Sequence, residues 1–177
     1  LDEVSACPPG IALSMQWMME RDGKILLENK PARCGDRLIR PKKGFHILCT
    51  DNTTLQGDTS GKYTGTQVQN EAFIDRMQYT LAMGYLAAGI EADMIRGYHP
   101  TLKKAVINNM VKLAGFIRSM YDGRDVSQTI SPRGLIEWGE ELVDTGSCEH
   151  AFIISIFNKY SPKDRPKLAD AYQKVFA

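Results

Sequence analysis

Asp2 and Glu3 form an acidic pair at the start of the chain, and the amide Asn52 and the arginines Arg76 and Arg133 follow at wide intervals. These residue types suit phosphoryl transfer, in which a protein mainly positions the reactants and stabilises charge. An aspartate can hold Mg²⁺ through its waters, and an adjacent glutamate can accept a proton from the attacking water. The pair therefore predicts a metal-holding Asp2 and a catalytic Glu3. The alternative is a solvated acidic tail.

Asn52 follows a compact apolar run at residues 45–50, which is typical of a buried central strand. The amide would then project from the carboxyl end of that strand, where open α/β sheets bind their ligands. A neutral amide can hold a water or a phosphate oxygen without competing for protons. We therefore predict that Asn52 contacts the nucleotide, with a simple turn-forming role as the alternative.

The two arginines are predicted to contact the γ-phosphate, because a guanidinium is always charged and can donate two parallel hydrogen bonds. Arg76 lies on an expected helix, and its alternative role is a surface ion pair with Asp75 or Glu71. Arg133 lies in the first turn of another expected helix, where a cation opposes the helix dipole. A bound phosphate would offset that unfavourable placement.

No segment of the chain matches the glycine-rich loop that cradles nucleotide phosphates. The stretch 57–63 resembles one, but it is one residue short between its glycines and has Tyr63 where a Mg²⁺-binding Ser or Thr belongs. Since the first residue is not methionine, we expect a truncated chain whose phosphate loop lies upstream of Leu1. By itself, such a chain should not bind or hydrolyse ATP well.

The net charge, the apolar runs and the cysteine content exclude several classes of protein. The 177 residues carry a net charge of +1, which gives no indication of a nucleic-acid partner or an anionic membrane surface. No apolar run approaches the ~20 residues that a membrane span needs. The 4 cysteines and 3 histidines lack metal-ligand spacing. We expect reduced cysteines that pack inside a cytoplasmic protein.

The first half of the chain has mixed helix and strand signals. Pro8 and Pro9 predict the start of a short, mostly buried helix that ends near residues 22–23. A hairpin is expected between residues 24–28 and 37–39, and a long loop over 56–69. A short helix over 70–77 and a strand over 78–86 complete this half.

The second half has helical periodicity only. One long helix is expected from Pro100 to residue 122, and a second begins at the cap Ser131. Two more are expected over 149–160 and from about residue 164 to the end. The fold class is therefore α/β followed by an all-helical part, with the domain boundary at 86–100: residues 1–90 form the first domain and residues 91–177 the second.

The order of these features resembles the MoxR branch of the AAA+ ATPases. The stretch 57–67, Gly-Asp-Thr-Ser-Gly-Lys-Tyr-Thr-Gly-Thr-Gln, is similar to a loop of the aerobic cobaltochelatase ATPase subunits, the CobS family. The resemblance is strongest from Leu1 to Leu86. In the helical part it depends mainly on the Ser-Pro-Arg motif at 131–133.

The resemblance implies a role for each of these residues: Asp2 and Glu3 match Walker B, Asn52 sensor one, Arg76 a trans-acting arginine finger and Arg133 sensor two. It implies a partial AAA+ αβα domain before a helical lid, with ATP and Mg²⁺ as cofactors. It also implies a homo-oligomeric, hexameric ring and a partner with a von Willebrand A-type domain.

Within the chelatases, the resemblance implies ATP-driven insertion of cobalt into a corrin ring by a separate large subunit. A MoxR-type chaperone that matures other proteins is the first alternative. A non-hydrolytic assembly domain is the second. The remodelled substrate and the size of the ring do not follow from the sequence.

Overall fold

A computed structural model describes residues 1–27, 29–31, 35–58 and 61–176. The chain divides into two compact units, Leu1–Ala82 and Met83–Ala177. Each unit has a hydrophobic core of its own. Within the described ranges, no helix is both long and apolar enough to cross a membrane.

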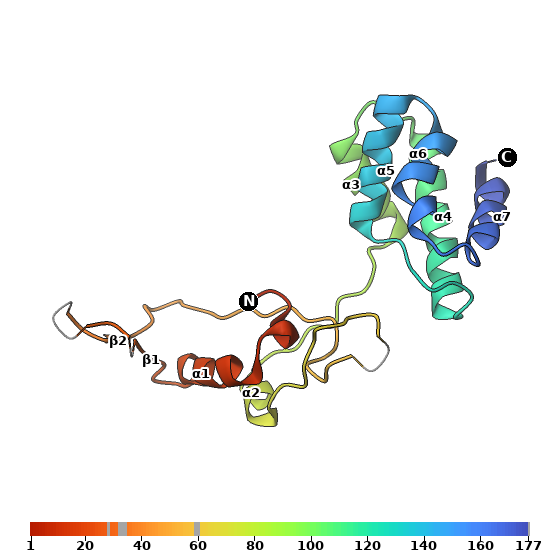
Figure 1. Ribbon diagram of the computed structural model, residues 1–177. Helices are drawn as coiled ribbons and strands as arrows, with labels where there is room; N and C mark the ends of the chain where they lie inside the picture. Colours follow the sequence, from red (N-terminus) through yellow and green to blue (C-terminus); the bar gives the residue numbers. More distant parts are fainter. Residues whose placement is uncertain (28, 32–34, 59–60, 177) are drawn as a thin grey trace. The chain divides into compact units, whose positions relative to one another are not determined.

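The first unit is built on two packed helices, α1 (Pro9–Met19) and α2 (Glu71–Asp75), which Figure 1 shows side by side. Pro9 begins α1 because proline is preorganised for the first helical turn. Asn70 caps α2 by accepting a hydrogen bond from the N–H of Ala72 at 2.8 Å. Phe73, which is fully buried, lies at the centre of the small core that joins them.

The predicted hairpin is confirmed. Strand β1 (Ile25–Leu26) pairs antiparallel with β2 (Leu38–Ile39), with Ile25 opposite Ile39. The expected turn between them includes residues 28 and 32–34, which lie outside the described ranges, as does Cys34. An isolated bridge between Gln56 and Val68 closes the base of the long loop.

Three expectations for this unit are wrong. The helix α1 is not mostly buried, since only Ala12 is buried and the other residues are exposed or half-buried. The run 45–50 is also not buried, since Ile47 and Cys49 are half-buried and the rest is exposed, and its long-range backbone hydrogen bonds in the described chain go to the N-terminus. A central strand needs neighbours on both edges and cover on both faces. The α/β layers expected here are therefore not present among the described residues.

The third wrong expectation is the strand predicted at 78–86. Residues 78–87 run extended without a paired strand in the described chain. Tyr79, Leu81 and Met83 are each more than 80% exposed. The alternating apolar pattern that predicted a strand is present, but no partner strand satisfies its backbone groups.

The second unit is a helical bundle of α3 (Ala88–Tyr98), α4 (Lys104–Asp122), α5 (Pro132–Thr145), α6 (Cys148–Ser155) and α7 (Arg165–Phe176), visible in Figure 1. The sequence reading missed α3, which occupies the expected boundary. It also placed the start of α4 four residues early. The predicted helix over 149–160 is divided between α6 and the short 3₁₀ helix η3 (Phe157–Lys159).

The core of the bundle forms around Trp138, which is fully buried on α5. Its ring lies 5.2 Å from that of Phe152 and 5.7 Å from that of Phe176, centroid to centroid. Its indole N–H donates to the carbonyl oxygen of Cys148 at 3.2 Å. Aromatic pairs at this separation stabilise a core beyond their buried area, and the hydrogen bond satisfies the polar end of the indole. Three helices are thus fixed against one another through one side chain.

Candidate functional site

The acidic pair lies beside the strand-like run that precedes Asn52. The backbone nitrogen of Leu1 donates to the oxygen of Leu48 at 2.7 Å, and Thr50 N–H donates to the oxygen of Leu1 at 2.9 Å. Leu1 thus bonds through its nitrogen to Leu48 and through its oxygen to Thr50, two residues further along. One residue that bonds two residues on either side of its neighbour is the pattern of parallel strands. The two segments therefore run side by side in the same direction.

One side chain, that of Thr50, contacts both acids. Its hydroxyl donates to Asp2 Oδ1 and accepts from the backbone N–H of Glu3 at 3.0 Å. Glu3 is exposed and adopts the left-handed conformation, φ 48° and ψ 55°. That conformation is unfavourable for a residue with a Cβ, and such residues cluster at functional sites. The hydrogen bonds to Thr50 hold Glu3 in it.

Asn52 lies two residues beyond Thr50. Its side chain is exposed, and in the part of the chain that the structure describes it makes no hydrogen bond. The amide is therefore free to meet a ligand. The structure thus brings the segment that bears Asn52 next to the segment that bears Asp2 and Glu3.

Asp51, between Thr50 and Asn52, is a positioning residue that the sequence reading missed. Its carboxylate accepts hydrogen bonds from the backbone N–H groups of Ser5 at 3.2 Å, Thr53 at 2.8 Å and Leu55 at 2.8 Å. Partial burial alone would raise the pKa of Asp51, but the hydrogen bonds from Ser5, Leu55 and Thr53 outweigh it and lower the pKa to about 2. The Asp-x-Thr spacing, which favours such side-chain turns, was the available signal.

Arg76 follows directly after α2 and is partly exposed, with a relative side-chain exposure of 32%. Its Nε donates to Glu20 Oε1 at 2.7 Å, and its Nη1 donates to the oxygen of Ala72 at 2.5 Å. The alternative partners considered from the sequence, Asp75 and Glu71, do not contact it. The ion pair instead joins the ends of α1 and α2.

Arg133 lies in the first turn of α5 in the second unit and is exposed. The predicted cap is confirmed, because the hydroxyl of Ser131 accepts from the N–H of Gly134 at 3.1 Å. In the described chain the Arg133 side chain has no hydrogen bond or ion pair. Its charge is therefore available to an anion.

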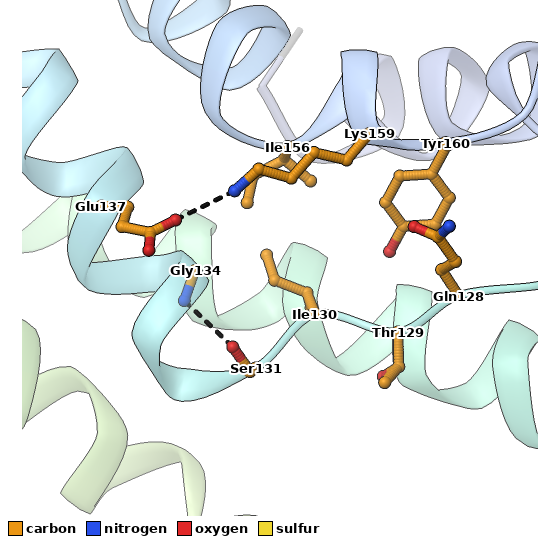
Figure 2. Close-up of a pocket in the computed structure, with 9 residues that line it drawn as sticks. All are labelled: Gln128, Thr129, Ile130, Ser131, Gly134, Glu137, Ile156, Lys159 and Tyr160. Atoms are coloured by element: carbon orange, nitrogen blue, oxygen red, sulfur yellow. Dashed lines mark hydrogen bonds and ion pairs between the residues drawn. The ribbon is translucent and has the colours of Figure 1, made fainter. Parts of the chain in front are cut away.

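A cavity of about 170 Å³ lies beside this helix start (Figure 2), lined by Gln128, Thr129, Ile130, Ser131, Gly134, Glu137, Ile156, Lys159 and Tyr160. Lys159 Nζ and Glu137 Oε2 form an ion pair across it at 3.0 Å. Burial raises the pKa of the Tyr160 phenol, whose hydroxyl has no partner in the described structure. The paired charges cancel, so the cavity does not favour an anion, and Arg133 does not line it.

The loop 57–63 has two residues, 59 and 60, outside the described ranges. Asp58 Oδ2 accepts from the N–H of Tyr63 at 2.6 Å. No cluster of three or more His, Cys, Asp or Glu that could hold a metal occurs among the described residues.

Known proteins are similar in sequence to this chain. Residues 91–177 match the family described as CbbQ/NirQ/NorQ C-terminal. The chain is 31% identical over 179 residues to the aerobic cobaltochelatase subunit CobS of Sinorhizobium sp, an alignment that covers 99% of this chain and 52% of that protein. The chain therefore spans about half the length of the curated relative that it matches.

The family resemblance predicted from the sequence is confirmed by these two matches. Residues 91–177 match the CbbQ/NirQ/NorQ C-terminal family, in a chain that is similar along its whole length to CobS and fits the C-terminal region of a MoxR-type AAA+ protein.

Proposed function

We propose that this chain is the sensor and lid part of an AAA+ ATPase that couples ATP hydrolysis to the remodelling of a partner. Residues 1–90 would form the C-terminal half of the AAA+ core, and residues 91–177 the helical lid. The observation that carries the proposal is the hydrogen bonding of Asp2 and Glu3 to Thr50, two residues before Asn52. The similarity to CobS supports it.

The acidic pair and Asn52 would serve the metal and the attacking water. Asp2 presents carboxylate oxygens, the ligand type that Mg²⁺ prefers, and only its Oδ1 is engaged within the described chain. Glu3 is exposed, so its carboxylate can accept a proton from water. Asn52 would orient that water through its amide. Bound Mg²⁺–ATP supplies the phosphoryl group that is transferred.

The arginines would stabilise charge at the γ-phosphate from different places. Arg133, on the lid, would reach the nucleotide of its own subunit. Arg76 would act across a subunit boundary on the nucleotide of a neighbour, as an arginine finger does. This division of roles requires a closed oligomer, and a hexameric ring is the arrangement that the family resemblance implies.

The similarity to CobS supports a proposal for the remodelled partner. We propose a cytoplasmic ATPase that drives cobalt, as substrate, into a corrin ring held by a separate large chelatase subunit, with a von Willebrand A-domain protein in the assembly. The second candidate is a MoxR-type chaperone that uses the same ATPase with a von Willebrand A-domain partner alone. A non-hydrolytic assembly domain is the third.

The ATPase role is tested by turnover of the full-length protein with one substitution at a time. Glu3→Gln should lower kcat by about 10²–10⁴-fold, the usual contribution of a general base. Arg76→Ala should lower it by about 10³–10⁵-fold, the range measured for arginine fingers. Asp75→Asn and Arg21→Ala are matched controls, since each removes an exposed charge without a partner in the described chain. Unchanged turnover in Glu3→Gln or Arg76→Ala removes the role assigned to that residue.

The chelatase and chaperone roles are separated by the partner. Co-purification with a large corrin-binding subunit, and ATP-dependent cobalt insertion by the reconstituted mixture, are expected for the chelatase. Recovery of a von Willebrand A-domain protein without such a subunit, and no insertion, would favour the chaperone.

A further inference from the structure

The roles proposed above make no use of the ion pair between Glu20 and Arg76. Glu20 directly follows α1, and Arg76 directly follows α2. The two residues are separated by 56 positions in the sequence, yet their side chains meet at 2.7 Å. Glu20 is 52% exposed, so burial does not force the contact.

The two helix ends are held together by the small core of the first unit. Fully buried Phe73 on α2 packs with Ala12 on α1, and Met19 and Met77 pack against them at the ends of the two helices. This packing fixes the distance between the backbones at Glu20 and Arg76. The ion pair therefore sets the direction of the Arg76 side chain rather than the position of its helix.

Two of the three guanidinium nitrogens of Arg76 are engaged. Nε donates to Glu20 and Nη1 donates to Ala72, whereas Nη2 has no partner in the described chain. A guanidinium has five N–H donors in a rigid fork. With Nε and Nη1 engaged, Nη2 remains available to a phosphate oxygen.

We propose that Glu20 is a positioning residue for Arg76: it holds the guanidinium in the orientation in which Nη2 reaches the γ-phosphate bound by the neighbouring subunit. The inference rests on the proposed role of Arg76. Without Glu20, a long and partly exposed arginine would occupy many rotamers, and the productive one would be populated less often. Catalytic groups misplaced by ~1 Å can lose about 100-fold in rate.

The test measures kcat and KM for ATP in the full-length oligomer. Glu20→Ala should lower kcat by about 10- to 100-fold with KM unchanged. An arginine finger stabilises the transition state in the neighbouring subunit, and it does not contribute to the binding of ATP before the reaction. Glu20→Gln, which keeps an acceptor oxygen for Nε, should fall between wild type and Glu20→Ala. Asp75→Asn, next to Arg76 in sequence but not in contact with it, should retain wild-type kcat. The melting temperature should stay the same throughout, since an exposed ion pair contributes little to stability.

Two further measurements separate positioning from general damage. In the Arg76→Ala background, Glu20→Ala should have no additional effect, because its target is gone. In mixed oligomers, Glu3→Gln subunits should restore turnover to Glu20→Ala subunits, since the former supply an intact Arg76 and the latter an intact acidic pair.

The outcomes are distinct. A severe Arg76→Ala defect with wild-type kcat in Glu20→Ala overturns this inference alone. Equal losses from Glu20→Ala with and without Arg76, or no restoration in mixed oligomers, also overturn it. Wild-type turnover in Arg76→Ala instead overturns the proposed finger.

Discussion

The carboxylate of Glu91 accepts two hydrogen bonds from the guanidinium of Arg118, Nη1 to Oε2 at 2.8 Å and Nη2 to Oε1 at 2.7 Å, inside the helical unit. Arg118 Nε also donates to the oxygen of Ile130 at 3.1 Å, and its guanidinium lies 3.8 Å from the centre of the Tyr85 ring. Glu91 is 1% exposed. The pair therefore ties α3 and α4 to the segment that leads into α5 and Arg133.

Removing one partner of this pair should be strongly destabilising. Glu91→Ala leaves the buried charge of Arg118 uncompensated, and such changes cost about 3–5 kcal/mol. Urea denaturation should show this loss, with Glu140→Ala, an exposed acid on α5, as the control within about 0.5 kcal/mol. The double change Glu91→Met with Arg118→Met should cost less than Glu91→Ala, because no unpaired charge remains. A Glu91→Ala loss under about 1 kcal/mol would contradict the buried pair.

Gly139 on α5 is required by a close contact with His99. A Cβ built at Gly139 would lie 2.5 Å from His99 Cδ2, and the ring is held because its Nε2–H donates to the oxygen of Ile136 at 2.9 Å. Gly139→Ala should therefore lower the free energy of unfolding by about 1–3 kcal/mol. Gly115→Ala, on α4 with open space around it, should instead stabilise the protein by about 0.5–1 kcal/mol. Thermal unfolding of both variants checks the prediction, and equal shifts would refute it.

Asp51 should make stability depend on pH in acid. Its folded pKa of about 2 lies below the model-compound value of 3.8, so its contribution is complete above pH ~4 and is lost as the pH falls towards 2. This lowering of the pKa corresponds to about 2 kcal/mol of the free energy of unfolding, and solvent screening reduces that contribution to about 1 kcal/mol. Asp51→Asn should be less stable than wild type at pH 7, and the gap should close by pH 2. The midpoints of urea unfolding between pH 7 and pH 2 measure this stability difference, with Asp75→Asn as the control. A difference that persists at pH 2 would show that the charge of Asp51 is not its cause.

Arg133 and Ser131 should affect different properties although they share the first turn of α5. Arg133→Ala should leave the free energy of unfolding within about 0.5 kcal/mol of wild type, since the side chain is exposed and unpaired in the described chain. Ser131→Ala should cost about 1 kcal/mol because the N-cap is lost. In the full-length protein, Arg133→Ala should weaken ATP binding by about 10- to 100-fold, the contribution of a charge-assisted hydrogen bond. Titration calorimetry measures that affinity, and wild-type binding would exclude Arg133 from the site.

The elements that could be predicted from the sequence are those with local signals. Ser131 before a proline caps its helix as expected, because capping depends on neighbours within three residues. A short helix was also expected from Asn70, which the structure shows to be its cap. The hairpin at β1 and β2 also follows from nearby residues. The helix α3 was missed because its glycines and its place within the expected boundary obscured its apolar face. Its buried Glu91 gave no local signal either, since its partner lies 27 residues away on α4.

Strands were less predictable, since a strand is stable only with neighbours that the local sequence does not specify. The pattern at 78–86 has the period of a strand, yet within the described chain nothing pairs with it. In the candidate site, residue type and order indicated the acidic pair and Asn52, whose segments lie side by side, and their roles stay predictions. Thr50, Asp51 and Glu20 could not, because each acts through a contact made by the folded chain.

The shared hydroxyl of Thr50 has a mechanical consequence. Its two hydrogen bonds, one to the Asp2 carboxylate and one from the Glu3 backbone, depend on a single torsion, χ1. Because staggered rotamers lie about 120° apart, any rotation to another rotamer would release both acids together. The positions of Asp2 and Glu3 are thus coupled through the side chain of Thr50, and a change of its rotamer would affect both.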